Sequence, residues 1–198
     1  MKTKHRYNTE VTRTELVAAA RAHFAGRGYA AARTEEIVGE TGLTRGALYH
    51  HFSNKKSLFQ AVLESLQTEL TEEVVERART VSGDHIDRLR AGFHAYLDLA
   101  LRDDVRQILF IDGPAVLGWE AWREIDLQHA FRLTQVAIER AMSDGEIDVV
   151  PVDELTHVLL GAVTHASLEV GRSSDPAVAR ASYGQIVDFL LDKLRKTG

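Results

Sequence analysis

Apolar residues recur along most of the chain at intervals of three and four positions, which is the spacing that places them on one face of an α-helix. Strand-like alternation is scarce, and only three prolines interrupt the 198 residues. We therefore expect an all-α protein of about nine helices. Capping residues and glycines between the apolar stripes predict helices near residues 9–27, 34–41, 45–51, 55–81, 86–102, 105–111, 118–142, 151–170 and 176–196.

Several of these bounds rest on residues with strong preferences for helix ends. We expect Gly28 to end the first helix in the left-handed conformation, and Thr34 and Thr44 to cap the second and third helices. The run Asp112-Gly113-Pro114 is expected to break the chain before the seventh helix. Pro176 is expected at the first position of the ninth helix, where its missing N–H group does no harm.

Residues 34–55 hold two short predicted helices joined by a tight turn, in the sequence TEEIVGETGLTRGALYHHFSNK. Gly42 stands in the turn, where the backbone needs a positive φ angle that glycine adopts without strain. Ile37, Val38, Leu43 and Leu48 are placed to lock the two helices together and against the first helix. This arrangement predicts a helix-turn-helix unit, whose second helix enters the major groove of DNA.

The N-terminal residues of that second helix face the bases in such a unit. Arg45 can reach a guanine edge or a phosphate, and Gly46 lets the backbone approach DNA closely. Thr34 and Lys55 stand at helix starts, where free backbone N–H groups attract phosphate. The predicted DNA contacts are Thr34, Thr44, Arg45, Gly46, Tyr49, His50 and Lys55.

The overall charge of −5 conceals an asymmetry that favours contact between one part of the chain and DNA. Residues 1–56 contain ten Lys and Arg against five Asp and Glu, whereas residues 57–198 contain fourteen against twenty-four. A basic first part on an acidic remainder is expected if only the first part meets phosphate.

The string GLTRGALYHHFSNKKSLFQAVLE resembles the DNA-binding domain of the TetR family of bacterial repressors, and the likeness extends over about residues 10–70. The turn glycine, the LYHHF segment, the following lysine and the Leu-Phe start of the next helix all match. The resemblance implies DNA contacts at the same seven positions, although relatives often have tyrosine where this chain has His50. It also implies a DNA-binding domain over residues 1–56 and an effector-binding and dimerisation domain over residues 57–198.

An effector-binding domain of this kind would hold a pocket for a small molecule between its helices, with apolar walls and a few polar groups. The candidate pocket residues are Phe93, Tyr96, Phe110, Trp119, Trp122, His129 and His165. The last two helices would pack against their copies in a second subunit as a four-helix bundle. The candidate dimer contacts are Gly161, Thr164, Leu168, Val178, Ser182, Ile186 and Phe189.

The remaining composition narrows the classes of function. The chain has no cysteine, which excludes disulfides and thiolate metal sites, and it lacks the common catalytic motifs. We therefore expect no enzyme activity, no metal and no other cofactor. The polar N-terminus, with Lys2 and Lys4, is unlike a secretory signal, and no run of 18 apolar residues exists. We expect a cytoplasmic protein with no membrane contact.

Together these patterns predict a sequence-specific transcriptional regulator. It would be a homodimeric repressor that leaves a palindromic double-stranded DNA operator when it binds a small, largely apolar effector. Two alternatives remain open, a helical adaptor that binds only protein and a helical metal-dependent enzyme. The second would use helical His–carboxylate pairs such as Asp153 with His157, which are more often surface or core polar contacts.

Overall fold

The computed structural model describes the backbone of residues 2–196 and the side chains of residues 11–128 and 130–196. Within this part the all-α prediction is confirmed, and the one pairing of extended backbone is an isolated bridge between Ile147 and Arg195. No helix of the described part is long and apolar enough to cross a lipid bilayer. The elements are α1 (Lys2–Ala31), α2 (Thr34–Thr41), α3 (Arg45–His51), α4 (Lys55–Thr80), α5 (His85–Leu99), α6 (Asp103–Val105), the π-helix η1 (Arg106–Asp112), α7 (Gly113–Leu117), α8 (Trp119–Ser143), α9 (Val152–Arg172) and α10 (Pro176–Leu194).

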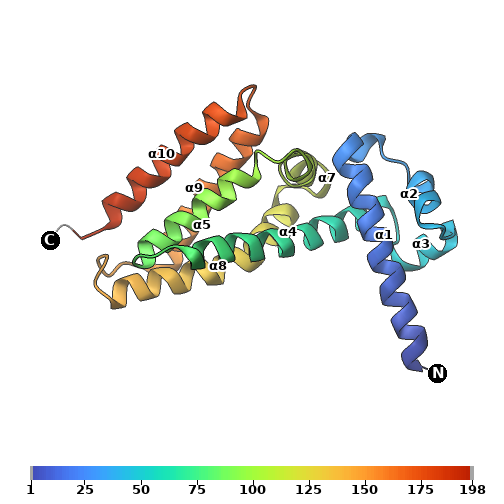
Figure 1. The fold of residues 1–198 in the computed structure, drawn as a ribbon, viewed down its shortest axis with the longest axis horizontal. Coiled ribbons are helices and arrows are strands. Elements are labelled where there is room, and N and C mark those ends of the chain that lie inside the picture. The colour runs from blue at the N-terminus through green and yellow to red at the C-terminus, as the bar shows by residue number, and fades with distance from the viewer. Residues whose placement is uncertain (1, 197–198) are drawn as a thin grey trace.

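The molecule is elongated and has two parts (Figure 1). Helices α1, α2 and α3 form a head at one end, and α5, α8, α9 and α10 form a body at the other. Helix α4 runs from the head into the body and packs against α1, α5 and α8 along the way. One continuous helix therefore connects the predicted DNA-binding unit to the interior of the body.

Local capping explains the bounds of the helix-turn-helix unit. Gly42 ends α2 in the left-handed conformation, with φ at 66°. Thr44 caps α3 through its Oγ1, which accepts a hydrogen bond from the Ala47 N–H at 3.1 Å. Asn54 caps α4 in a reciprocal capping box with Ser57. The cap predicted at Thr34 is wrong by one position, because Arg33 takes the extended cap conformation and makes no side-chain hydrogen bond there.

Two groups of buried apolar side chains hold the fold together. The first passes from the head into the body and includes Phe24 of α1, Phe59 of α4 and Phe110 of η1. The rings of Phe24 and Phe59 meet edge to face with centroids 5.2 Å apart. The second lies within the body and includes Phe93 of α5 and Leu160 of α9. Because the first group is continuous, the packing of the head depends on the packing of the body.

The segment between α5 and α8 departs from the sequence prediction. The expected break at residues 112–114 is wrong, because the chain stays helical through η1 into α7 and turns at Gly118, whose φ is 90°. Pro114 lies in the first turn of α7, directly after η1, so its missing N–H group interrupts one hydrogen bond of the continuous helix. Gly113 serves close packing instead of a turn, since a Cβ there would lie 2.6 Å from Cδ1 of Trp122.

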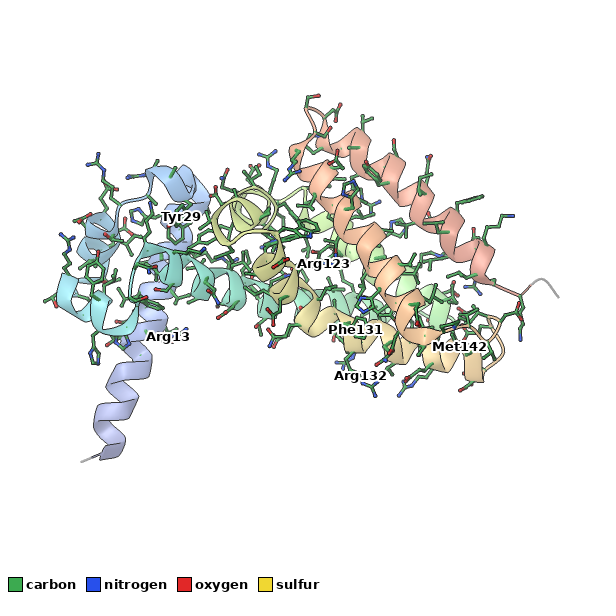
Figure 2. The ribbon with its side chains drawn as sticks, turned by 180° about the vertical axis from the view of Figure 1, so that it is seen from behind. Arg13, Tyr29, Arg123, Phe131, Arg132 and Met142 are labelled. Carbon is green, nitrogen blue, oxygen red and sulfur yellow. The ribbon has the colours of Figure 1, made fainter. Side chains whose placement is uncertain are left out.

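Helix α1 is longer than predicted, but its regular geometry is interrupted at Gly28, where we expected the helix to end. Gly28 has a positive φ of 72°, and helical structure resumes beyond it to Ala31. The backbone N–H of Tyr29 then donates to Oδ2 of Asp112 at 2.7 Å, and Nε2 of Gln107 donates to the same oxygen at 2.9 Å. Figure 2 shows Tyr29 where the head meets the body. Asp112 therefore ties the first helix of the head to η1.

Alanine at position 113 tests this close packing. The new Cβ would meet the fully buried Trp122 and would lie 3.0 Å from Cδ1 of Leu63. We expect the free energy of unfolding to fall by about 1–3 kcal/mol, as in other overpacked sites. Gly26→Ala is the matched control, because nothing lies within 4 Å of its Cβ position and alanine is favoured inside helices by about 0.5–1 kcal/mol. Urea unfolding measures both, and an unchanged stability for Gly113→Ala would contradict the packing.

Candidate DNA-binding surface and internal cavity

Helix α3 lies in the head at the end of the molecule away from the body (Figure 1). Arg45 is exposed, with its guanidinium 5.5 Å from the ring centroid of Tyr49 and 3.2 Å from Oε1 of Glu35 on α2. Tyr49 is 42 % exposed. Because an exposed ion pair contributes little stability, Glu35 can orient Arg45 in the free protein and release it to DNA at small cost.

The other predicted contacts on and before α3, namely Thr44, Gly46 and His50, are also exposed. Thr44 accepts the capping hydrogen bond, so its own hydroxyl hydrogen stays available to a phosphate. A Cβ at position 46 would meet only Oγ1 of Thr44, at 3.7 Å. Packing within the chain therefore does not require this glycine, whereas close approach of a DNA backbone would.

Lys55 and Thr34 begin α4 and α2 but are half-buried. The Nζ of Lys55 lies 3.4 Å from the carbonyl oxygen of Ala30 and 4.4 Å from the ring centroid of Tyr29. Burial lowers the pKa of the Lys55 ammonium below its ordinary value. Lys55 is thus held against the end of α1, apart from the exposed group on α3. The hydroxyl of Thr34 donates to Glu35 at 3.4 Å.

A cavity of about 160 Å³ lies in the body between α4, α5, α8 and α9. Its walls are mostly apolar and include Leu70, Val74, Leu89, Phe93, Leu127 and Val163. A smaller set of polar side chains completes the lining, among them Gln67, Tyr96, Asp126, Thr134 and Thr164. Apolar walls with a few placed polar groups are typical of sites that hold small organic molecules.

The polar side of this cavity is organised around the buried carboxylate of Asp126. Its Oδ1 accepts hydrogen bonds from Nε2 of Gln67 at 2.8 Å and from the hydroxyl of Tyr96 at 2.5 Å, and its Oδ2 accepts one from Oγ1 of Thr164 at 3.0 Å. Burial raises the pKa of the Asp126 carboxyl, and it raises the pKa of Tyr96 well above its ordinary value. Helices α4, α5, α8 and α9 meet at this one group.

Four of the seven predicted pocket residues lie elsewhere. Phe110 and Trp122 are fully buried in the core that joins head and body, and Nε1 of Trp122 donates to the Leu109 carbonyl at 2.8 Å. Trp119 is 50 % exposed beside Trp122, and His165 is exposed on α9. Residue type alone does not distinguish a core position from a cavity wall. Phe93 and Tyr96 do line the cavity, and the side chain of His129 lies outside the described residues.

The predicted dimer contacts divide by helix. Those on α10 are exposed, and Val178, Ile186 and Phe189 are each more than half exposed. On α9, Gly161 is half-buried, and the assignment of Thr164 and Leu168 is wrong because both are buried within their own chain. Gly171 near the end of α9 allows close packing on η1, since a Cβ there would lie 3.3 Å from Cβ of Phe110. The outward face of α9 carries Val158, which is 66 % exposed.

Two family descriptions match the chain in the order of its two parts. Residues 16–62 match the bacterial regulatory proteins of the tetR family, and residues 86–194 match the tetracyclin repressor-like C-terminal domain. The chain belongs to the TetR family. The first match covers most of the head with the start of α4, and the second covers the body from α5 to α10.

Individual TetR-family proteins match most of this chain. The transposon Tn10 TetC protein of Escherichia coli is 26 % identical over 161 residues, which cover 81 % of each protein. The HTH-type transcriptional repressor AcnR of Corynebacterium diphtheriae is 28 % identical over 79 % of this chain and 80 % of its own. The crystal structure of a TetR-family regulator from Pectobacterium atrosepticum superposes with a TM-score of 0.87 at 29 % identity, over 97 % of this chain and 98 % of that one.

These relatives and the helix-turn-helix head show that the protein is a TetR-family DNA-binding transcriptional regulator. AcnR, a repressor of Streptomyces coelicolor and the Pectobacterium atrosepticum protein are all named as regulators of transcription. The helix-turn-helix prediction and the family resemblance are therefore confirmed, while the roles of single residues stay predictions.

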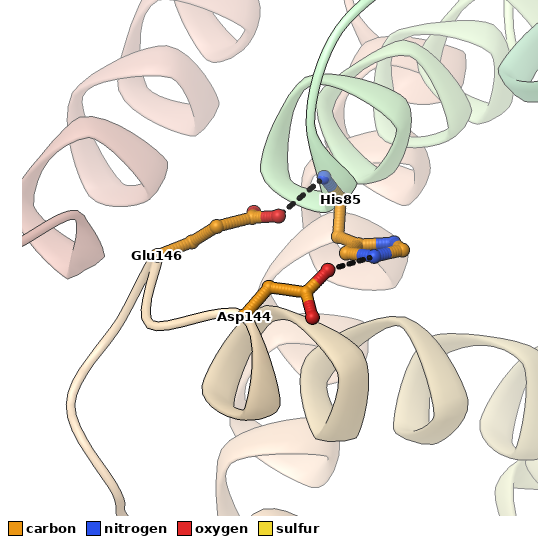
Figure 3. Close-up of side chains that lie close together, drawn as sticks. All are labelled: His85, Asp144 and Glu146. Carbon is orange, nitrogen blue, oxygen red and sulfur yellow. Dashed lines mark hydrogen bonds and ion pairs between the residues drawn. The ribbon is translucent and has the colours of Figure 1, made fainter.

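A separate cluster of His85, Asp144 and Glu146 joins the start of α5 to the end of α8, with candidate ligand atoms within 4.8 Å of one another (Figure 3). The two oxygens of Glu146 accept the backbone N–H groups of His85 at 3.0 Å and Ile86 at 3.1 Å. Asp144 contacts Nε2 of His85 at 3.0 Å. A helix N-terminus favours anions and disfavours cations. We therefore interpret these three side chains as a cap on the start of α5 and not as a metal site.

Sequence reasoning missed Asp126 and Gln67 and placed Thr164 on the wrong side of α9. A signal for Asp126 was present, since it stands between Ile125 and Leu127 and four residues after Trp122, on the apolar side of its helix. An acid in that position must find hydrogen-bond donors when it is buried. Which helices supply those donors depends on how α4, α5 and α9 pack around α8, and local sequence does not specify that.

Replacing Arg45 with alanine tests α3 as the recognition helix of this TetR-family protein. Losing a base contact is expected to weaken operator binding by roughly 5- to 150-fold at fixed salt, which corresponds to about 1–3 kcal/mol. Fluorescence anisotropy with fragments from the gene's own upstream region measures the affinity. Arg79→Ala is the matched control, because it removes an equally charged, exposed side chain from the far end of α4. Equal losses in the two variants would overturn the assignment.

Proposed function

We propose that this TetR-family protein is a homodimeric repressor that leaves a palindromic operator when a small, largely apolar effector fills the cavity of the body. The observation that carries the proposal is the position of that cavity, whose wall includes α4, the helix that begins in the DNA-binding head at Lys55. A relative named as a repressor, AcnR of Corynebacterium diphtheriae, supports repression as the direction of regulation.

A second subunit is needed because a palindromic operator presents two half-sites, each read by one helix-turn-helix. The outward faces of α9 and α10 support such a contact. Val158 of α9 and Val178, Ile186 and Phe189 of α10 are large apolar residues exposed on two neighbouring helices. A patch of this kind on a regulator is typical of a homodimer interface. We therefore place the subunit contact on these two faces.

Two routes lead from the cavity to the head. The first is α4 itself, since Gln67 lines the cavity on the helix that starts at the DNA surface. The second begins at Tyr96, which meets Phe110 of η1 edge to face with centroids 5.9 Å apart. Asp112, two residues after Phe110 at the end of η1, accepts a hydrogen bond from the backbone N–H of Tyr29 in the head. An effector that moves Tyr96 or Gln67 would therefore shift the two heads of the dimer relative to their half-sites.

The direct test is a gel-shift titration of the purified full-length protein against fragments of its upstream region, with unrelated DNA of equal length as competitor. We expect a discrete complex that survives the competitor at moderate salt. A folded dimer that binds both DNAs equally would contradict the proposal. The alternative of a protein-binding adaptor predicts no DNA complex and no effect of Arg45→Ala. For the expected regulator the site of action is the cytoplasm, where bacterial DNA lies.

Placing a charge in the proposed subunit contact tests the dimer. Phe189→Asp puts a carboxylate at a position that would be desolvated on dimerisation, so the dimer dissociation constant should rise by roughly tenfold or more. Leu101→Asp is the matched control, because Leu101 is 42 % exposed in the turn after α5 and belongs to neither α9 nor α10. Sedimentation velocity across protein concentrations reports the change. A Phe189→Asp protein that stays as tightly dimeric as Leu101→Asp would show that the contact lies elsewhere.

A further inference from the structure

The buried carboxylate of Asp126 is an unusual group for the wall of an apolar cavity. The residue is 5 % exposed, and among the described side chains its polar contacts all come from uncharged donors on Gln67, Tyr96 and Thr164. Arg123, which Figure 2 labels, stands three residues earlier on α8, and its charge lowers the pKa of Asp126 less than each of the three hydrogen bonds does. The negative charge of Asp126 thus lacks an adjacent described cation.

A buried charge without a partner is costly, and the cost is removed most directly by a cation brought into contact with it. The three donors occupy three of the roughly four lone-pair positions of a carboxylate. One acceptor position of Oδ2 is therefore left for a ligand. Burial raises the pKa of the Asp126 carboxyl, so without a ligand the neutral form is favoured over a wider range of pH than usual.

The aromatic rings of the lining favour the same class of ligand. Phe93 and Tyr96 both lie on the wall that also contains Asp126. Aromatic faces attract ammonium groups by about 0.5–1 kcal/mol at exposed sites and more where water is excluded. An anion beside aromatic rings, inside otherwise apolar walls, is a chemical arrangement suited to an organic cation.

We propose that the cavity binds a small organic ammonium ion whose apolar, aromatic part lies against the walls and whose charged nitrogen contacts Asp126. This deepens the proposed function, on which it rests only in treating the ligand as the effector. The cavity volume of about 160 Å³ is close to that of an engineered cavity of about 150 Å³ that accepts benzene. A ligand with one aromatic ring and a short amine arm fits this size.

Arg88 is the other charged residue of the cavity lining. Its positive charge suggests a competing possibility, which is that the cavity prefers a negatively charged ligand. Its side chain is exposed on the first turns of α5, so water and salt screen its charge. A ligand with a carboxylate could reach Arg88 at the rim but would bring a second negative charge toward Asp126. The sign of the charge on the preferred ligand therefore shows whether Asp126 or Arg88 determines ligand choice.

The test uses three probes of nearly equal size, 2-phenylethylamine, 2-phenylethanol and phenylacetate, with the full-length protein in isothermal titration calorimetry. We expect the amine to bind roughly ten- to 150-fold more tightly than the alcohol, as for a hydrogen bond to a charged group, and phenylacetate to bind most weakly. An alcohol that binds as well as the amine, or a preference for phenylacetate, overturns the proposal without any variant.

Asp126→Asn removes the charge and keeps the shape, so it should abolish most of the preference for the amine while changing alcohol binding little. Glu120→Gln is the matched control, because it also replaces a carboxylate of α8 with an amide but stands at an exposed position outside the cavity lining, so it should leave the preference intact. If Asp126→Asn does not fold, the pH dependence of the wild type answers the question. Amine affinity should fall as the pH is lowered through the raised pKa of Asp126, because the carboxyl becomes neutral, while alcohol affinity stays constant. A flat profile for the amine contradicts the proposal.

The proposed repressor function and the proposed ligand class would be contradicted by different experimental results. A gel-shift titration of the wild type without probe reports operator binding by itself. Specific operator binding without any preference for the amine would contradict the proposed ligand class but not the proposed repressor function. Amine binding that depends on Asp126, in a protein that recognises no operator, would contradict the repressor function but not the proposed ligand site.

Discussion

The burial of one side of α4 is the constraint on which the rest of the structure depends. Leu58 and Phe59 near its start pack in the head, and Leu66 and Leu70 further along pack toward the body, all of them almost wholly excluded from water. Each such side chain stabilises the fold by about 1.5–3 kcal/mol relative to an exposed position. Because a packed helix bends little, burial at both ends sets the position of the head relative to the cavity.

The polar cluster around Asp126 is the main departure from this apolar packing. Gln67 of α4, Tyr96 of α5 and Thr164 of α9 all donate to one carboxylate of α8. Removing a carboxylate from water is expensive, and such costs concentrate where a protein binds or reacts with something. The same hydrogen bonds tie three helices to α8, so a ligand that engages Asp126 acts directly on the contacts that position α4.

The second connection between the two parts runs through the π-helix η1. π-Helical turns are rare and are frequently found at functional sites. Here the segment places Phe110 against Tyr96 at the cavity and Asp112 against the backbone of Tyr29 at the head. The glycine at position 28, with its positive φ, gives the end of α1 the shape that presents the Tyr29 N–H to Asp112. Head and body are therefore joined by a specific hydrogen bond as well as by apolar packing.

The sequence by itself determined the helical class and most helix bounds, because capping and turn preferences act within a few residues. The left-handed Gly42, the Thr44 cap and the capping box at Asn54 are all local, and together they define the DNA-binding head. The family likeness of that head was readable for the same reason.

Tertiary structure alone decided which side chains meet across the body. Trp122 and Asp126 stand one turn apart on α8, yet the first is fully buried in the core between head and body and the second lines the cavity. Gly113 reads as a turn residue in sequence but is required by the approach of Trp122. Thr164 reads as part of an outward small-residue face but donates inward to Asp126. Each of these outcomes depends on the angle and depth at which whole helices pack, and that arises from contacts between residues far apart in the chain.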